Sequence, residues 1–286
     1  MALLRREFLA AATSVAFGKS KGVRAGCQSN AWRIPDYPAF LGVLDRIKAH
    51  GYAGFETGFR NLQKRFGDTV ATRLEMEKRG LVFLGIHIFL LEYDPETSIA
   101  PWDLLASVAD GGAALGAERL ILSGRSLADA GARKNKAAAL NRTGEYARKR
   151  GLQLAYHNHD AEFRNGGAEI EELMAATDGG LVRMVLDAGH AWFGGGDVPA
   201  FFNKHHQRID GMHLRDFRRR GATKEDPDPQ VALGLGVNDL APLVAAVRRH
   251  RWQGWVINEE ERLNDGRPGD TAIGPARAHV RKLFGV

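Results

Sequence analysis

The 286-residue chain lacks several features that would place it in a specialised class of protein. Its single cysteine, Cys27, excludes an internal disulfide framework and any cysteine-rich zinc or iron–sulfur site. No apolar run approaches the roughly 18 residues that a bilayer-crossing helix needs. The composition, 44% hydrophobic and 26% charged, is that of a globular protein and excludes disordered, collagen-like and coiled-coil chains. The length suits two small domains or one α/β barrel of roughly 250 residues.

The net charge of +6 leaves nucleic acid open as a partner, but half of it lies in the first 21 residues. There, Arg5 and Arg6 precede a short apolar run over residues 8–17, a pattern that resembles a twin-arginine export signal. Removing residues 1–21 takes away four basic residues and Glu7, so that +6 becomes +3. We therefore expect a leader over residues 1–21 and a periplasmic protein. The alternative is a cytoplasmic protein whose amphipathic N-terminal helix lies on the folded domain.

From residue 22 onward, short apolar runs alternate with longer helical patterns. Near-continuous apolarity over four to seven residues is typical of parallel strands buried on both faces. We predict eight strands, over residues 23–27, 52–56, 81–87, 119–123, 152–157, 182–187, 209–214 and 255–259. We predict helices between them, over residues 37–50, 69–79, 102–115, 135–150, 168–176, 198–204 and 240–250. This alternation favours a single-domain (β/α)8 TIM barrel over residues 22–286. An open doubly wound sheet, the alternative, would carry a glycine-rich fingerprint after its first strand, and none is present there.

Polar residues gather at the ends of the predicted strands. In a TIM barrel these ends meet at one mouth, where the chemistry is performed. Each such residue, taken alone, is more often an ordinary polar residue at the edge of a core. Imidazoles and carboxylates on four successive strands, however, are the ligand types of a divalent metal site. On the fifth to eighth strands these residues are His157, His159, Asp187, His190, His213 and Glu259, while Glu56 and His87 end the second and third strands.

Five segments carry a family pattern: YHNHDAEF (156–163), VLDAGHAWFGGGD (185–197), MHLRDF (212–217), LGLGVNDLAPLV (233–244) and GWVINEEE (254–261). In these segments, and in their order along residues 23–286, the chain resembles the xylose-isomerase-like barrel superfamily, the sugar phosphate isomerase/epimerase group. The resemblance implies one divalent metal ion, which many members hold with Glu, Asp, His and Glu on strands five to eight.

The predicted ligands follow from matching these positions. Asp187, His213 and Glu259 fall on the last three, and His157 replaces the first glutamate, as in a subgroup with the YHNHD motif. The fourth ligand is then His157, or else a water molecule or Glu162. Two carboxylates and two neutral imidazoles leave a divalent ion formally neutral, which favours Mn²⁺, Zn²⁺, Co²⁺ or Fe²⁺ over Mg²⁺.

The resemblance implies a sugar isomerase or epimerase that removes a proton next to a carbonyl and stabilises the resulting enediolate with the metal. Glu259 is the first candidate for the base, with His159 or Glu162 on the other face of the substrate. His190 is expected to bind a substrate oxygen or to support the catalytic groups. Further candidates for binding a hydroxyl, an anionic end or a sugar face are His87, Arg215, Arg219, Trp32 and Trp192.

Other functions remain open. A lyase or dehydratase on a keto-sugar or keto-polyol begins with the same proton abstraction and then expels a β-hydroxyl or glycosyl group. The superfamily also includes abasic-site endonucleases, but these need further histidines after strand seven, and residues 226–230 contain none. If no metal is held, a non-enzymatic binding barrel remains. We expect a small sugar or keto-sugar as partner, no nucleic acid, no membrane and, from the resemblance alone, a homo-oligomer.

Overall fold

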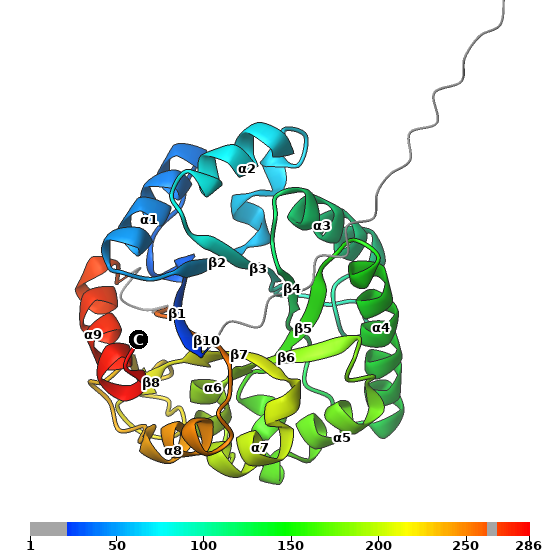
Figure 1. The fold of residues 1–286 in the computed structure, drawn as a ribbon. Helices are drawn as coiled ribbons and strands as arrows, with labels where there is room; N and C mark the ends of the chain where they lie inside the picture. The colour runs from blue at the N-terminus through cyan, green and yellow to red at the C-terminus, as the bar shows by residue number, and fades with distance from the viewer. Residues whose placement is uncertain (1–21, 262–267) are drawn as a thin grey trace, which may run out of the picture.

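The computed structural model describes residues 22–261 and 268–286, so the predicted leader lies outside the described residues. Eight parallel strands close into a barrel in the order β1-β10-β7-β6-β5-β4-β3-β2, and helices surround it (Figure 1). The predicted single-domain (β/α)8 TIM barrel is therefore confirmed. The barrel strands are β1 (Val23–Gln28), β2 (Gly54–Gly58), β3 (Val82–Ile88), β4 (Arg119–Leu122), β5 (Gln153–His157), β6 (Val182–Asp187), β7 (Ile209–Leu214) and β10 (Gly254–Asn258).

The interior of the barrel is built in layers. Two small buried clusters are separate from the large core between strands and helices. One consists of Leu84, Trp255 and Ile257, and the other of Ile121, Ala155 and Val185. Successive side chains of a strand alternate between its two faces. His157 and Asp187 each lie two residues beyond a member of these clusters, and so share its inward face. The apolar layer therefore supports a polar layer at the mouth.

Nine helices lie in the described residues: α1 (Tyr37–Ala49), α2 (Thr69–Glu77), α3 (Trp102–Ala114), α4 (Ala130–Arg148), α5 (Ala168–Ala176), α6 (Ala188–Phe193), α7 (Val198–His205), α8 (Ala241–Arg249) and α9 (Asp270–Phe284). The helix predicted from residue 135 begins earlier, because Asp129 caps it by accepting a 2.7 Å hydrogen bond from the Ala132 N–H. Neither α6 nor α9 was predicted. The first has only six residues, and the second contains Pro275.

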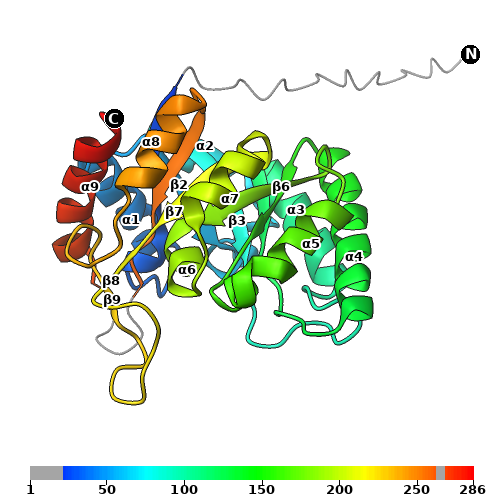
Figure 2. The same ribbon diagram turned by 90° about the horizontal axis from the view of Figure 1, so that it is seen from below.

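The loops after the strands form the mouth, at the lower edge of Figure 2. There β8 (Asp216–Phe217) and β9 (Gln230–Val231) pair as an antiparallel ribbon whose connecting loop projects away from the barrel (Figure 2). Within the described part of the chain, no helix combines the length and apolar character needed to span a membrane.

Candidate metal centre

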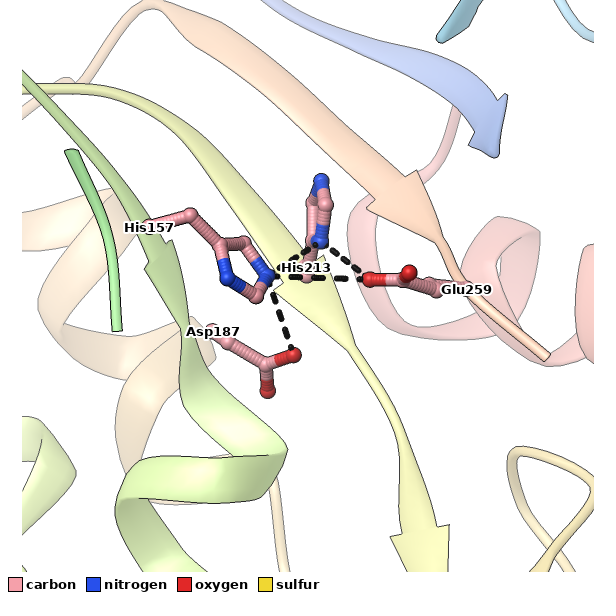
Figure 3. Close-up of side chains that lie close together, drawn as sticks. All are labelled: His157, Asp187, His213 and Glu259. Atoms are coloured by element: carbon pink, nitrogen blue, oxygen red, sulfur yellow. Dashed lines mark hydrogen bonds and ion pairs between the residues drawn. The ribbon is translucent and has the colours of Figure 1, made fainter. Parts of the chain in front are cut away.

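Four side chains from neighbouring strands converge at the mouth (Figure 3). His157 ends β5, Asp187 ends β6, His213 lies in β7 and Glu259 directly follows β10. All four are buried, and one ligand atom from each lies within 4.8 Å of the others. His157 Nε2 is 2.9 Å from His213 Nδ1, 3.5 Å from Asp187 Oδ2 and 3.7 Å from Glu259 Oε2. The four ligands predicted from sequence thus come together in space.

The second oxygen of each carboxylate is held by the protein. Asp187 Oδ1 accepts a 2.7 Å hydrogen bond from the His190 N–H, which makes Asp187 the N-cap of α6. Glu259 Oε1 accepts a 3.0 Å hydrogen bond from the Asn30 amide. The backbone of Asp187 is fixed in addition by a reciprocal pair of hydrogen bonds with the Asn158 side chain. Each carboxylate is therefore oriented so that its other oxygen faces the centre.

The imidazoles are oriented in the same way. His213 turns Nδ1 inward, and its Nε2 lies 2.7 Å from Glu56 Oε2. His157 turns Nε2 inward, and its Nδ1 lies 3.3 Å from Ser123 Oγ, which also contacts His87 Nε2 at 3.0 Å. Partners of this kind are usual behind metal-bound histidines, because they fix the ring and its tautomer.

Carboxylates determine much of the charge around the centre. Burial alone would lower the pKa of His213, but the carboxylates of Glu259 and Glu56 raise this pKa to about 10. Arg215 lies beside the group and donates 2.7 Å contacts to both Asp187 and Glu259. Burial would raise the pKa of Asp187, but the Arg215 guanidinium holds it well below its usual range. A protonated histidine must lose a proton to bind a metal ion, and with His213 neutral the three carboxylates and Arg215 leave two formal negative charges, which a divalent cation would balance.

The residues fit such a cation. Two imidazole nitrogens and two carboxylate oxygens are ligand types shared by Zn²⁺, Mn²⁺, Co²⁺ and Fe²⁺. Two ligands that each lie about 2.1 Å from one ion are at most about 4.2 Å apart. To bind one ion, the farthest ligand atoms of this group, within 4.8 Å of one another, must move slightly closer, and His157 Nε2 and His213 Nδ1, 2.9 Å apart, must move slightly apart. The preference for these metals over Mg²⁺ stays a prediction.

Three further histidines extend from this group. The His159 ring lies 5.2 Å from His157 and 5.1 Å from His190, and the His87 ring lies 4.9 Å from His157. Burial lowers the pKa of His159 to about 4 and holds those of His87 and His190 well below their usual range. These imidazoles are neutral at pH 7, and each can both donate and accept a hydrogen bond.

Glu162, predicted as a base, has both oxygens engaged. Oε1 lies 3.0 Å from Lys136 Nζ and accepts a hydrogen bond from the Tyr156 hydroxyl, while Oε2 accepts one of 2.8 Å from the His159 N–H. Lys136 and Glu162 are each about 1% exposed. The structure therefore gives Glu162 the position of a buried counterion behind the His159 loop, and its catalytic role stays a prediction.

The predicted substrate-binding residues are more scattered. Arg215 pairs with the ligand carboxylates, whereas Arg219 lies on the β8–β9 loop and pairs with Asp226 at 2.7 Å. Trp32 is buried in the core, and Trp192 faces Phe217 with 6.1 Å between ring centroids. Their roles toward a substrate stay predictions.

Sequence analysis assigned no role to several residues that complete the centre. Glu56 stands at a strand end in the sequence, but nothing there pairs it with His213, 157 positions away. Ser123 and Asn30 carry no sequence signal at all, because their function depends on which ring or carboxylate lies opposite. These residues become neighbours only through the alignment of the strands around the closed barrel.

Comparison with known sequences identifies the family of this chain. A sequence model of the family described as xylose isomerase-like TIM barrel matches residues 44–283. An inosose dehydratase of Lacticaseibacillus casei is 33% identical over 136 residues, which make up 44% of this chain and 46% of the relative. The chain thus spans about half the length of the first curated relatives it matches. An inosose dehydratase of Clostridium perfringens is 24% identical over 272 residues, covering 85% and 91%.

The fold is also found among solved structures. A sugar phosphate isomerase/epimerase from Parabacteroides distasonis superposes with a TM-score of 0.71 at 17% identity, covering 92% of this chain and 97% of that one. The resemblance seen in the sequence is confirmed at the level of the family, while membership of the YHNHD subgroup stays a prediction. The match over residues 44–283 shows that this chain belongs to the xylose isomerase-like TIM barrel family.

Proposed function

We propose that this protein is a divalent-metal-dependent lyase that removes water from a cyclic keto-polyol of the inosose type. The observation that carries the proposal is the buried group of His157, Asp187, His213 and Glu259, bordered by neutral imidazoles. The relatives named inosose dehydratase favour this reaction over the isomerase or epimerase that sequence analysis placed first. When bound in this group, a divalent ion supplies a Lewis acid that polarises the substrate carbonyl.

The side chains of the protein then have to carry out two proton transfers. A base takes the proton from the carbon next to the carbonyl, and the electron pair of the broken C–H bond forms the double bond of an enediolate. When the carbonyl re-forms, the hydroxyl on the β-carbon leaves and takes up a proton to become water, which yields an unsaturated ketone. His159 and His190, whose rings lie 5.1 Å apart, are the candidates for this transfer. The neutral imidazole that takes the proton from carbon becomes an imidazolium, which is then the acid that gives this proton to the leaving hydroxyl.

Glu259 fits the role of a ligand better than that of the base. Its Oε1 is engaged by Asn30, and its Oε2 faces His213 and Arg215. Burial would raise the pKa of Glu259, but Arg215 and His213 hold this pKa well below its usual range. Glu259 is therefore a poor proton acceptor.

An isomerase or epimerase is the second candidate, because it shares the first proton abstraction and differs only in where the proton returns. An abasic-site endonuclease finds less support. Of the arginines that could contact phosphates, Arg218 and Arg219 both pair with Asp226, and Arg220 donates to the Trp192 carbonyl.

Proton NMR in D2O tests the proposal. The purified chain is freed of metal, reloaded with Mn²⁺, Zn²⁺ or Co²⁺, and incubated with an inosose and with open-chain ketoses. We expect loss of the signal next to the carbonyl together with an unsaturated product that has lost one water. Exchange without loss of water would instead establish the epimerase. No exchange with any substrate under any metal would refute both. His206→Ala is the matched control, because His206 lies in the short 3-10 helix (His206–Arg208) that directly precedes β7, at the opposite end of the barrel.

A further inference from the structure

One aromatic ring at the mouth is exposed without an evident structural reason. Among the described residues, the large apolar side chains that remain exposed are Val70, Leu74, Phe89, Leu91, Leu235 and Val237. Phe89 is the only ring in this set, and 48% of it is accessible to solvent. An exposed phenylalanine keeps apolar surface in contact with water, which is unfavourable. Exposed apolar surface of this kind is typical of a site where a ligand or partner binds.

Phe89 directly follows β3, at the end of the barrel where the ligand group lies. Its ring centroid is 5.6 Å from that of His159, which is in turn 5.2 Å from that of His157. The rings of Phe89 and His159 are tilted by 53° instead of being stacked. Phe89 is thus the outermost of a series of rings that leads to the candidate metal centre.

The backbone at this position is braced from the neighbouring loop. Arg60, which follows β2, donates a 3.1 Å hydrogen bond from its guanidinium to the Phe89 carbonyl. The Arg60 guanidinium also lies 4.8 Å from the centre of the Phe59 ring, which is buried. Because the backbone that carries the ring is held in place, less conformational freedom is lost when the ring binds a ligand.

The chemistry of a cyclic polyol matches such a ring. Its hydroxyls point mainly outward and suit imidazoles and carboxylates, while its C–H groups form an apolar face that packs against an aromatic side chain. We propose that Phe89 is a substrate-binding residue that covers the C–H face of a cyclic keto-polyol or sugar while the neighbouring histidines contact its hydroxyls. This assignment rests on the proposed function of the site.

Leu91 provides a matched comparison. It lies in the same loop and is 92% exposed, but it is aliphatic. If the exposed side chains of this loop served to bind a second protein chain, replacing Leu91 would have an effect similar to that of replacing Phe89. If Phe89 covers a substrate, only the ring at position 89 matters.

The experiment compares wild type, Phe89→Ala, Phe89→Tyr and Leu91→Ala, all loaded with Mn²⁺, in steady-state kinetics with an inosose and in calorimetric binding of the non-reacting polyol myo-inositol. We expect Phe89→Ala to raise KM and the dissociation constant about 2- to 12-fold with little change in kcat, and Phe89→Tyr and Leu91→Ala to resemble wild type. Metal content and melting temperature should not change in any variant.

Each other outcome has a definite meaning. If wild type turns over the inosose and Phe89→Ala has unchanged KM and binding, the assignment of Phe89 is overturned and the proposed function stands. If Phe89→Ala and Leu91→Ala both alter the oligomeric state in light scattering and leave KM unchanged, the loop is a protein interface, and the assignment is again overturned. If wild type neither turns over nor binds any cyclic polyol, the proposed function fails and the assignment fails with it.

Discussion

The buried pair of Lys136 and Glu162 allows a test that separates a structural from a catalytic role for Glu162. Lys136 Nζ lies 3.0 Å from Glu162 Oε1 and donates a 2.8 Å hydrogen bond to the Arg125 carbonyl. The pair therefore joins the loop after β4 to the turn that carries His159. The informative variants are Lys136→Met, Glu162→Gln and the two combined.

The expected magnitude follows from burial. Both side chains are about 1% exposed, so removing either partner leaves a charge that water cannot reach. Breaking a buried pair in this way costs about 3–5 kcal/mol, whereas removing both charges costs much less. The ammonium left by Glu162→Gln keeps one further carboxylate, Glu169, at 3.8 Å, so the loss for this variant falls at the lower end of the range. We therefore expect each single variant to lose about 3–5 kcal/mol in free energy of unfolding, and the double variant to lose less than the sum by about 2 kcal/mol or more.

Urea unfolding followed by circular dichroism measures these differences. Lys134→Met is the control, because Lys134 is exposed on the same helix and its loss should change stability by no more than about 0.5 kcal/mol. If Glu162 were instead the catalytic base, Glu162→Gln would lose about 10²- to 10⁴-fold in activity with stability nearly unchanged. That result, or additive effects in the double variant, would refute the role of the pair as a structural support.

Three further predictions concern the residues around the centre. Glu56→Gln removes the carboxylate behind His213 and should weaken metal binding about 10- to 100-fold in competition with a chromophoric chelator; an unchanged affinity would contradict the role given to Glu56. Arg219→Ala should leave KM unchanged, because Arg219 pairs with Asp226 on the projecting loop, and a clear rise in KM would show that the sequence-based assignment was right. Gly189→Ala would place a Cβ atom 2.6 Å from Arg215 Cβ and should cost about 1–3 kcal/mol in urea unfolding, whereas wild-type stability would mean that α6 can move away.

Much of the fold could be predicted because a barrel strand that is buried on both faces has a nearly continuous run of apolar residues. The second strand shows the limit of this rule. It was predicted over residues 52–56 and is observed over Gly54–Gly58. Tyr52 is apolar enough to resemble a strand residue, but it lies before the strand, with its hydroxyl 3.0 Å from the Asn258 side chain. A run of apolar residues does not show which of them join the sheet.

The four side chains of the candidate metal centre could be predicted because each lies at or near the end of a recognisable strand and matches a family motif. Their supporting residues could not. Lys136 is one of several lysines in a basic helix, and only the packing of α4 against β5 shows that it is buried against Glu162. In the sequence, Phe89 resembles any apolar residue that follows a strand, and only the structure shows that it is exposed. Pairings across the barrel depend on strand register, which the sequence alone does not determine.

The central claim is that His157, Asp187, His213 and Glu259 bind one divalent ion. Its most direct test is elemental analysis together with calorimetric titration of the metal-free chain with Mn²⁺, Zn²⁺ and Co²⁺. The account predicts one ion per chain in wild type and in the His206→Ala control, a rise in melting temperature on loading, and loss of the ion in His157→Ala and Asp187→Asn. A wild-type chain that binds none of these ions, or a His157→Ala variant that binds as tightly as wild type, would contradict it.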